Sequence, residues 1–428
     1  MSKQVASSNP LVAIACGGTG GHLFPGVAVG EELLARGCDV LLIVSEKAID
    51  RRAAEGAQDM EVVSLPAVGL GRNPLRFLAG LWSSRRAILK RFRERRPAAV
   101  LGMGGFTSAA PILAGRAVGA RTFLHESNTI PGRANRWLAR FVDQAFVWFP
   151  ETKERWNQPQ AVAVGTPVRG AFRAADPDAA REALGLDRDC PTLLVTGGSQ
   201  GAEGINQAIV NIAPTLCDAV EGLQILHLTG ARDLEAVSTA YAKANIAAIT
   251  HAFLDDIPAA LNAATLVVGR AGASSMAEIA AIGAPAILVP YPHAADNHQF
   301  HNAGAFVAAG AARMVEQNDG MSDVLSEQII DLFRDPEKLN TLSRNVHRRH
   351  EPNAARRIAE CILAATTHRQ PADQERGACA NAGRVDRSGQ IENRAGQPRL
   401  GELMTDDRQF GACLCTATPN SRKEASLR

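Results

Sequence analysis

The chain has 428 residues, of which 46% are hydrophobic, and its formal net charge is only +2. This length can bury two full cores, so we expect two or three domains, whereas a nearly balanced charge favours no class of partner. The eight cysteines form no C-x-x-C pair and no metal-ligand spacing with histidine, so we expect no metal site and a reducing compartment rather than secretion. We also expect neither a signal peptide nor a transmembrane helix.

The first expected strand, over residues 11–15, runs into a loop with four glycines and a histidine, Gly17-Gly-Thr-Gly-Gly-His22, and a helical pattern follows. Glycines permit positive φ angles and a close approach of the backbone to a ligand, and the helix start offers unpaired N–H groups. The loop is therefore typical of an anion site, although a strand–helix turn can also be only a turn. Leu23 stands where a dinucleotide-binding loop has its third glycine, which disfavours a nicotinamide cofactor.

Short β-rich stretches alternate with helical patterns through the first half of the chain. Strands are expected near 38–44, 61–65, 98–102, 121–124 and 143–148. This alternation predicts a parallel sheet covered by helices on both faces. Ligands bind such sheets at the carboxyl ends of the strands, where Gly17–His22, Gly102–Ser108 and His125–Asn128 all fall.

The stretch 72–96 carries nine basic residues and one acidic residue. Its apolar and central basic members are Leu75, Phe77, Leu78, Leu81, Trp82, Arg85 and Arg86. Two interpretations remain open: an ordinary amphipathic helix packed on the sheet, or a loop and helix that bind an anionic membrane surface. Nucleic-acid binding is disfavoured, because no stacking aromatic residues or recognised motif accompany the charge.

The second half repeats the alternation, with strands expected near 192–196, 223–228, 246–249, 265–269 and 285–290. Its first strand again ends in a glycine loop, Gly197-Gly-Ser-Gln-Gly201. We therefore expect two α/β, Rossmann-like domains facing a cleft, one over 1–168 and one over 169–368, with a last helix near 352–366 that belongs to the second domain or returns to the first. The stretch 369–428 shows no sustained periodicity and is expected to be a disordered tail.

Glu278 follows the strand expected at 265–269 and lies one turn into the next helix, after the small residues Ala271–Ser275. An acidic residue at this place can accept hydrogen bonds from two sugar hydroxyls, as acids do for riboses in nucleotide sites. A glutamate in a first helical turn is also favoured by the helix dipole alone. The spacing by itself does not separate these two explanations.

Five motifs, in this order and spacing, closely resemble the MurG family of N-acetylglucosaminyltransferases, which convert lipid I to lipid II in peptidoglycan synthesis. They are Gly17–His22, Gly102–Phe106, His125–Asn128, Gly197–Gly201 and Gly269–Glu278. The resemblance covers about residues 10–366. It implies the GT-B fold, an inverting hexosyl transfer without metal or cofactor, the donor UDP-N-acetylglucosamine and an undecaprenyl-diphosphate-linked muramylpentapeptide as acceptor.

The resemblance also implies the residues of the donor pocket. These are Thr19, Gly20, Gly21, Asn128, Arg169, Ser199, Leu254, Ala273, Ser274, Ser275, Met276, Ala277, Glu278, His298 and Gln299. Glu278 would hold the ribose, and Ser199 with the second glycine loop would hold the diphosphate. His298 departs from the family, which often has glutamine there. Ser127 and Phe106 depart from it on the acceptor side.

His22 is our candidate for the general base that takes a proton from the acceptor hydroxyl, because it ends the first glycine loop and so points into the cleft. His125 and Glu126, after a neighbouring strand, are the rival bases. His22 can also merely cap its loop by hydrogen bonding.

The resemblance favours a protein bound peripherally to the cytoplasmic face of the plasma (inner) membrane, because the acceptor lipid cannot leave the bilayer. A UDP-N-acetylglucosamine 2-epimerase is the closest alternative enzyme, since it shares the fold and the nucleotide. A non-catalytic membrane scaffold for cell-wall enzymes is the alternative from another class. Intact His22, Asn128 and Glu278 argue against that scaffold.

Overall fold

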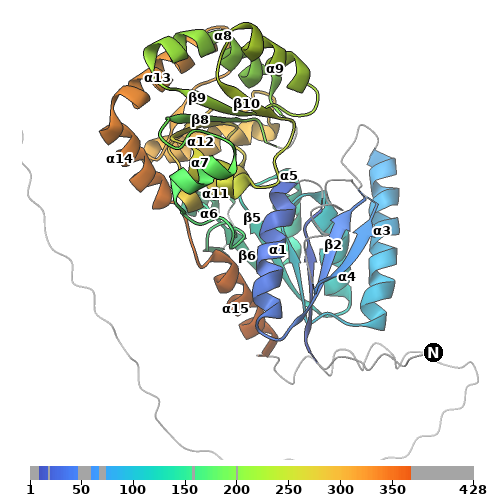
Figure 1. The fold of residues 1–428 in the computed structure, drawn as a ribbon. Helices are drawn as coiled ribbons and strands as arrows, with labels where there is room; N and C mark the ends of the chain where they lie inside the picture. The colour runs from blue at the N-terminus through green and yellow to red at the C-terminus, as the bar shows by residue number, and fades with distance from the viewer. Residues whose placement is uncertain are drawn as a thin grey trace, which may run out of the picture. The chain divides into compact units, whose positions relative to one another are not determined.

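The computed structural model describes residues 9–17, 20–46, 59–66, 74–156, 160–198 and 201–367. Within these ranges the chain forms two parallel β-sheets, each covered by helices on both faces (Figure 1). The expected α/β class with two Rossmann-like domains is therefore confirmed. The tail expected over 369–428 lies outside the described residues.

The N-terminal sheet has seven strands in the order β3-β2-β1-β4-β5-β6-β7. They are β1 (Leu11–Ala15), β2 (Asp39–Ser45), β3 (Glu61–Leu65), β4 (Ala99–Gly102), β5 (Arg121–Glu126), β6 (Gln144–Val147) and β7 (Ala161–Ala163). The central strands are apolar runs without alternation, because helices bury both of their faces. Helices α1 (Gly20–Leu34) and α15 (Ala354–Thr367) cover one face, and α3 (Pro74–Glu94), α4 (Ala109–Ala117), α5 (Arg133–Leu138) and α6 (Pro150–Trp156) cover the other.

The C-terminal sheet has six strands in the order β10-β9-β8-β11-β12-β13. They are β8 (Thr192–Thr196), β9 (Gln224–Leu228), β10 (Ala248–His251), β11 (Leu266–Gly269), β12 (Ala286–Leu288) and β13 (Arg313–Met314). One face packs on α7 (Pro177–Ala183), α10 (Ile257–Ala263), α11 (Ala273–Ile282) and α12 (His298–Ala308). The other packs on α8 (Glu203–Ala219), α9 (Leu234–Lys243), α13 (Met321–Arg334) and α14 (Pro336–His347).

Both sheets reverse their strand order beside their first strand, between β1 and β4 and between β8 and β11. At such a point the connections leave the sheet in opposite directions and open a crevice at the carboxyl ends of the strands. The first glycine loop and α1 follow β1, and α11 follows β11. The fold therefore places the predicted ligand loops where open α/β sheets bind ligands.

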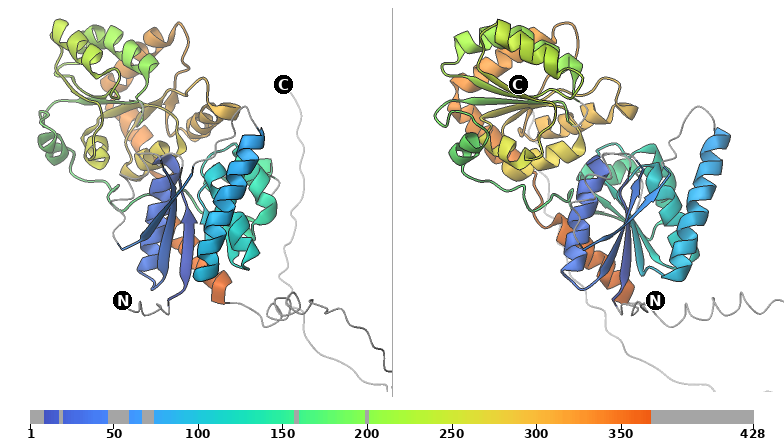
Figure 2. Two further views of the ribbon diagram at one scale, coloured as in Figure 1. Left: turned by 90° about the vertical axis from the view of Figure 1, so that its right-hand side faces the viewer. Right: turned by 45° about the vertical axis from the view of Figure 1, so that its right-hand side comes forward.

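Every strand expected from the sequence is present, with ends that differ by at most two residues. The short edge strands β7 and β13 were not expected, since three and two residues carry too little periodicity to be recognised. The last helix, α15, lies along α1, where Ile358 and Ile362 join the core of the N-terminal sheet (Figures 1 and 2). The sequence pattern of this helix is compatible with either domain, and its packing against α1 assigns it to the first.

Candidate active site

His22 lies in the first turn of α1 and its ring packs against the loop after β4. A Cβ atom on Gly104 would lie 2.9 Å from Cε1 of His22, and Gly104 has a φ of +116°, so only glycine fits there. The loop after β1 is tied to the same place, because Thr107 donates a hydrogen bond from Oγ1 to the carbonyl of Gly17 at 2.6 Å. His22 therefore lies against the loop after β4, where the strand order of the N-terminal sheet reverses.

His125 is the last but one residue of β5, and its side chain is fully buried. Its Nε2 atom is 2.9 Å from the carbonyl oxygen of Gly165, and its Nδ1 atom is 3.3 Å from Oγ of Ser127. Burial lowers the pKa of His125 to about 4. Both ring nitrogens are thus engaged by the protein, which makes His125 a poor proton acceptor for a ligand.

Glu126 is also almost completely buried, and its carboxylate is fully hydrogen-bonded. Oε1 accepts from the backbone N–H and from Nδ2 of Asn128, both at 2.9 Å. Oε2 accepts from the backbone N–H of Gly132 and from Nδ2 of Asn135, both at 2.8 Å. This carboxylate therefore shapes the loop between β5 and α5, and no acceptor position of the usual four is left for a substrate proton.

The start of α11 supplies the second group of predicted ligand residues. Gly272 is the N-cap, and the N–H of Met276 is the first to bond within the helix, so the N–H groups of residues 273–275 have no intrahelical partner. Their small side chains let a ligand approach the backbone. The side chains of Met276 and Ala277 are buried in the core, so these two can contribute only backbone atoms to a site.

Glu278 follows one turn into α11. Burial raises the pKa of its carboxyl to about 7, while the positive charge of Arg169 acts in the opposite direction. No described residue donates a hydrogen bond to this carboxylate. A desolvated acid without a protein partner is the feature expected of a ligand-binding residue rather than of a helix-dipole glutamate.

Arg169 lies in the stretch that leads from the N-terminal to the C-terminal sheet. Its guanidinium lies 4.1 Å from the ring centroid of Phe24 and 5.3 Å from that of Phe172. The Nε–H group is buried and finds no hydrogen-bond partner among the described residues. An arginine fixed by two aromatic rings with a spare N–H donor is well suited to bind an anionic ligand beside Glu278.

The structure gives local contacts for most of the remaining predicted donor residues. Asn128 bonds to Glu126 and, through its Oδ1 atom, to Asn302 on α12. Leu254 is half-buried against the core after β10, next to the exposed Phe253. Gln299 accepts from the backbone N–H of Tyr291 at 3.0 Å. The Nδ1 atom of His298 lies 2.8 Å from the carbonyl oxygen of Ala295. Gly20 and Gly21 are the first two residues of α1. Thr19 and Ser199 lie outside the described residues.

Sequence reasoning missed Asn302, a completely buried asparagine that bonds to Asn128, Thr129 and Ala271. The available signal was an asparagine on the face of α12 that also carries the core residues Ala303 and Phe306. A polar side chain at a core position needs hydrogen-bond partners that local patterns do not reveal.

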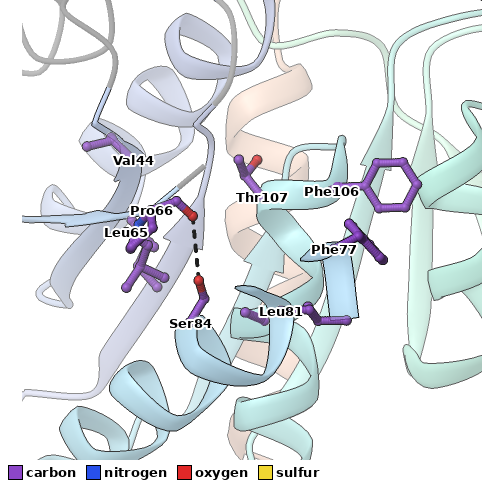
Figure 3. Close-up of a pocket in the computed structure, with 10 residues that line it drawn as sticks. Val44, Leu65, Pro66, Phe77, Leu81, Ser84, Phe106 and Thr107 are labelled. Atoms are coloured by element: carbon purple, nitrogen blue, oxygen red, sulfur yellow. Dashed lines mark hydrogen bonds between the residues drawn. The ribbon is translucent and has the colours of Figure 1, made fainter. Parts of the chain in front are cut away.

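Helix α3 divides the residues expected at a membrane into two sets. Leu75, Leu78 and Trp82 are 75%, 56% and 62% exposed and lie on one face of the helix. Phe77 and Leu81 instead face the protein. Together with Phe106, which meets the Phe77 ring edge-on at 5.1 Å, they line a small apolar pocket at the ends of β2 and β3 (Figure 3). No helix in the part of the chain that the structure describes is long and apolar enough to cross a membrane.

Arg85 and Arg86 lie one turn further along α3, and the guanidinium of Arg86 lies 5.6 Å from the ring centroid of Trp82. The exposed face of this helix thus joins apolar side chains to positive charge.

Comparison with known proteins places these features in one family. The glycosyltransferase family 28 N-terminal domain matches residues 12–147, and the family 28 C-terminal domain matches residues 192–358. The UDP-N-acetylglucosamine--N-acetylmuramyl-(pentapeptide) pyrophosphoryl-undecaprenol N-acetylglucosamine transferases of Anaeromyxobacter sp. and Geobacter sulfurreducens are each 37% identical. The alignments cover 85% and 82% of this chain and 96% and 98% of theirs.

The comparison with solved structures supports the same family. The crystal structure of Acinetobacter baumannii MurG superposes with a TM-score of 0.65 at 26% identity, over 83% of this chain and 99% of that one. A putative UDP-N-acetylglucosamine 2-epimerase of Listeria monocytogenes gives a TM-score of 0.60 at 15% identity, over 82% and 95%, and so shares only the fold. The chain therefore belongs to glycosyltransferase family 28, within the MurG glycosyltransferases.

Proposed function

We propose that the protein transfers N-acetylglucosamine from UDP-N-acetylglucosamine to the muramyl 4-hydroxyl of an undecaprenyl-diphosphate-linked muramylpentapeptide, the step from lipid I to lipid II. The observation that carries this proposal is the pair formed by Glu278 on α11 and Arg169 in the stretch between the two sheets. This pair leaves a carboxylate and a buried N–H donor for the ribose and the phosphates of a nucleotide. The names of the curated relatives supply the same donor and acceptor.

The decisive assay incubates labelled UDP-N-acetylglucosamine with a lipid I analogue and scores label in the lipid phase. Incubation with the donor alone is the matched control. Formation of UDP-N-acetylmannosamine in that control, without transfer to lipid, would identify a 2-epimerase instead. Binding of the donor without formation of either product would favour the alternative of a non-catalytic membrane scaffold.

In the proposed reaction His22 takes the proton of the acceptor hydroxyl while that oxygen attacks the anomeric carbon of the donor. The bond to the UDP oxygen breaks on the opposite face, which inverts the anomeric centre. Negative charge developing on the leaving diphosphate is stabilised by the N–H groups that open α11 and by the guanidinium of Arg169.

We assign residues 1–168 to the acceptor and the membrane, and residues 169–368 to the donor, with α15 returning to the N-terminal sheet.

The stretch 369–428 adds nothing to either role in this proposal. Truncation after His368 should therefore leave the melting temperature and the transfer rate essentially unchanged. A large fall in melting temperature, measured by calorimetry, would show that the removed residues stabilise the rest of the chain.

We further propose that the exposed face of α3 binds the cytoplasmic face of the plasma membrane. Leu75, Leu78 and Trp82 would enter the headgroup region, while Arg85 and Arg86 approach anionic lipid. Each basic residue near such a surface contributes about 1 kcal/mol, and salt weakens that attraction.

Replacing Trp82 by Ser and both Arg85 and Arg86 by Glu should abolish most sedimentation with anionic vesicles at low salt. Val324→Ser, an exposed apolar position on α13, is the control and should bind as the wild type does. Equal sedimentation of the triple variant would rule out α3 as the membrane anchor.

A further inference from the structure

The side chain of Asn302 is completely buried, and all its hydrogen-bonding positions are used. Oδ1 accepts from the backbone N–H of Thr129 at 3.0 Å and from Oγ1 of Thr129 at 3.1 Å. Nδ2 donates to Oδ1 of Asn128 at 3.0 Å and to the carbonyl of Ala271 at 3.3 Å. One amide thus connects three separate stretches of chain.

The three stretches are the loop with Asn128 and Thr129, the backbone at Ala271, and the α12 helix, which carries Asn302 itself. Asn128 and Thr129 follow β5 of the N-terminal sheet, in the loop that Glu126 braces with its carboxylate. Ala271 follows β11 of the C-terminal sheet and directly precedes Gly272, the N-cap of α11. Asn302 therefore joins the loop on the acceptor side to the backbone at which the proposed donor helix begins.

A second, weaker connection runs between the same regions. Arg136 on α5 donates to Oδ2 of Asp296 at 2.7 Å, and Arg133 approaches Oδ1 of Asp296 at 3.4 Å. Asp296 lies in the turn that precedes α12 and has a positive φ of 50°. Because both arginines are well exposed, these ion pairs contribute little on their own. The buried amide of Asn302 carries the connection.

We infer that Asn302 is a positioning residue for the transfer reaction: it holds the Asn128–Thr129 loop in register with the start of α11, and so sets the two halves of the site against each other. The inference rests on the proposed function. His22 and the donor helix belong to different sheets, and reacting atoms must come within roughly 3–3.5 Å in the correct orientation. A shift between the sheets therefore lowers the rate of the chemical step more than it lowers donor affinity.

The test is Asn302→Asp, which keeps the shape and the Oδ1 acceptor. An oxygen then replaces Nδ2 and faces two acceptors, Oδ1 of Asn128 and the carbonyl of Ala271. We expect kcat to fall at least tenfold at pH 8, while the Kd for UDP changes by less than threefold. Protonation restores one donor to the new side chain, and burial favours that neutral form, so the ratio of variant to wild-type kcat should rise as the pH falls toward 6.

The matched control is Asn262→Asp. Asn262 is another buried asparagine, and its amide bonds to backbone groups of Ala175, Arg173 and Pro258 rather than to the Asn128–Thr129 loop or to the start of α11. A purely structural effect would lower the melting temperature of both variants and leave both kcat values alike. We expect only the Asn302 variant to lose kcat. Thr129→Val, which removes one hydroxyl donor, gives a milder variant of the same network and should lower kcat in the same direction.

An Asn302→Asp kcat within threefold of the wild type at pH 8 would overturn the inference. So would a kcat loss that is independent of pH and equal in the Asn262 control. If the aspartate variant does not fold, an unchanged kcat in folded Thr129→Val would overturn it. A wild-type protein that makes no lipid-linked product contradicts the proposed function instead, and the two failures are thereby distinguished.

Discussion

Replacing His22 by Ala should lower the transfer rate by about 10² to 10⁴-fold, the usual loss when a general base is removed. The structure narrows the choice of base. His125 has a pKa of about 4 and both ring nitrogens engaged, and the Glu126 carboxylate accepts four hydrogen bonds from the protein. His22 instead lies against Gly104 and Gly105 in the loop after β4, and these glycines leave room for its ring.

The measurement is single-turnover transfer to a lipid I analogue, with the Kd for UDP-N-acetylglucosamine determined separately by calorimetry. His347→Ala serves as a histidine control, because His347 is exposed at the end of α14, beside Gly283 at the opposite end of α11 from Gly272. This variant should retain the wild-type rate. A fall of less than tenfold in His22→Ala with intact donor binding would remove His22 from the role of base. His125 and Glu126 would then have to be tested in spite of their hydrogen bonds.

Replacing Glu278 by Gln should weaken UDP binding tenfold or more at pH 8. A charge-assisted hydrogen bond contributes about 1.5–3 kcal/mol, and each 1.4 kcal/mol is a factor of about ten in Kd. The Glu278 carboxylate accepts no hydrogen bond from the described protein, so its loss removes ligand contacts and leaves no protein donor unpaired. Unchanged UDP affinity in the folded variant would refute the assignment of Glu278 to the ribose.

The pKa of Glu278 adds a pH dependence to this result. Burial raises that pKa to about 7 in the free protein, and ribose hydroxyls donate to the ionised form, so nucleotide binding favours deprotonation. The affinity for UDP should therefore be highest above pH 8 and should fall about tenfold by pH 6, which is the loss expected when one group with this pKa becomes protonated. The phosphate of UDP also titrates near pH 6, so the Glu278→Gln variant is the reference and should lack the Glu278-dependent part of the slope.

The alternation of strands and helices and the place of Glu278 one turn into α11 could be predicted from the sequence. These features are local. An apolar strand that runs into glycines and a helix start fixes the conformation of a short stretch, and repeating that unit leaves a parallel sheet as the only way to bury both faces of each strand. The ligand loops then follow from the carboxyl ends of the strands.

The contacts of the other site residues could not be predicted from the sequence, because they join distant parts of the chain. The ring of His125 is hydrogen-bonded to the carbonyl of Gly165, which lies 40 residues away in the sequence. Asn302 bonds to Thr129, which lies 173 residues away. The apolar residues of α3 looked alike in the sequence, and only packing against Phe106 and the strand ends separated the inward Phe77 from the exposed Trp82. A hydrogen bond or a burial pattern between distant residues depends on where the chain brings them, and no local periodicity encodes that distance.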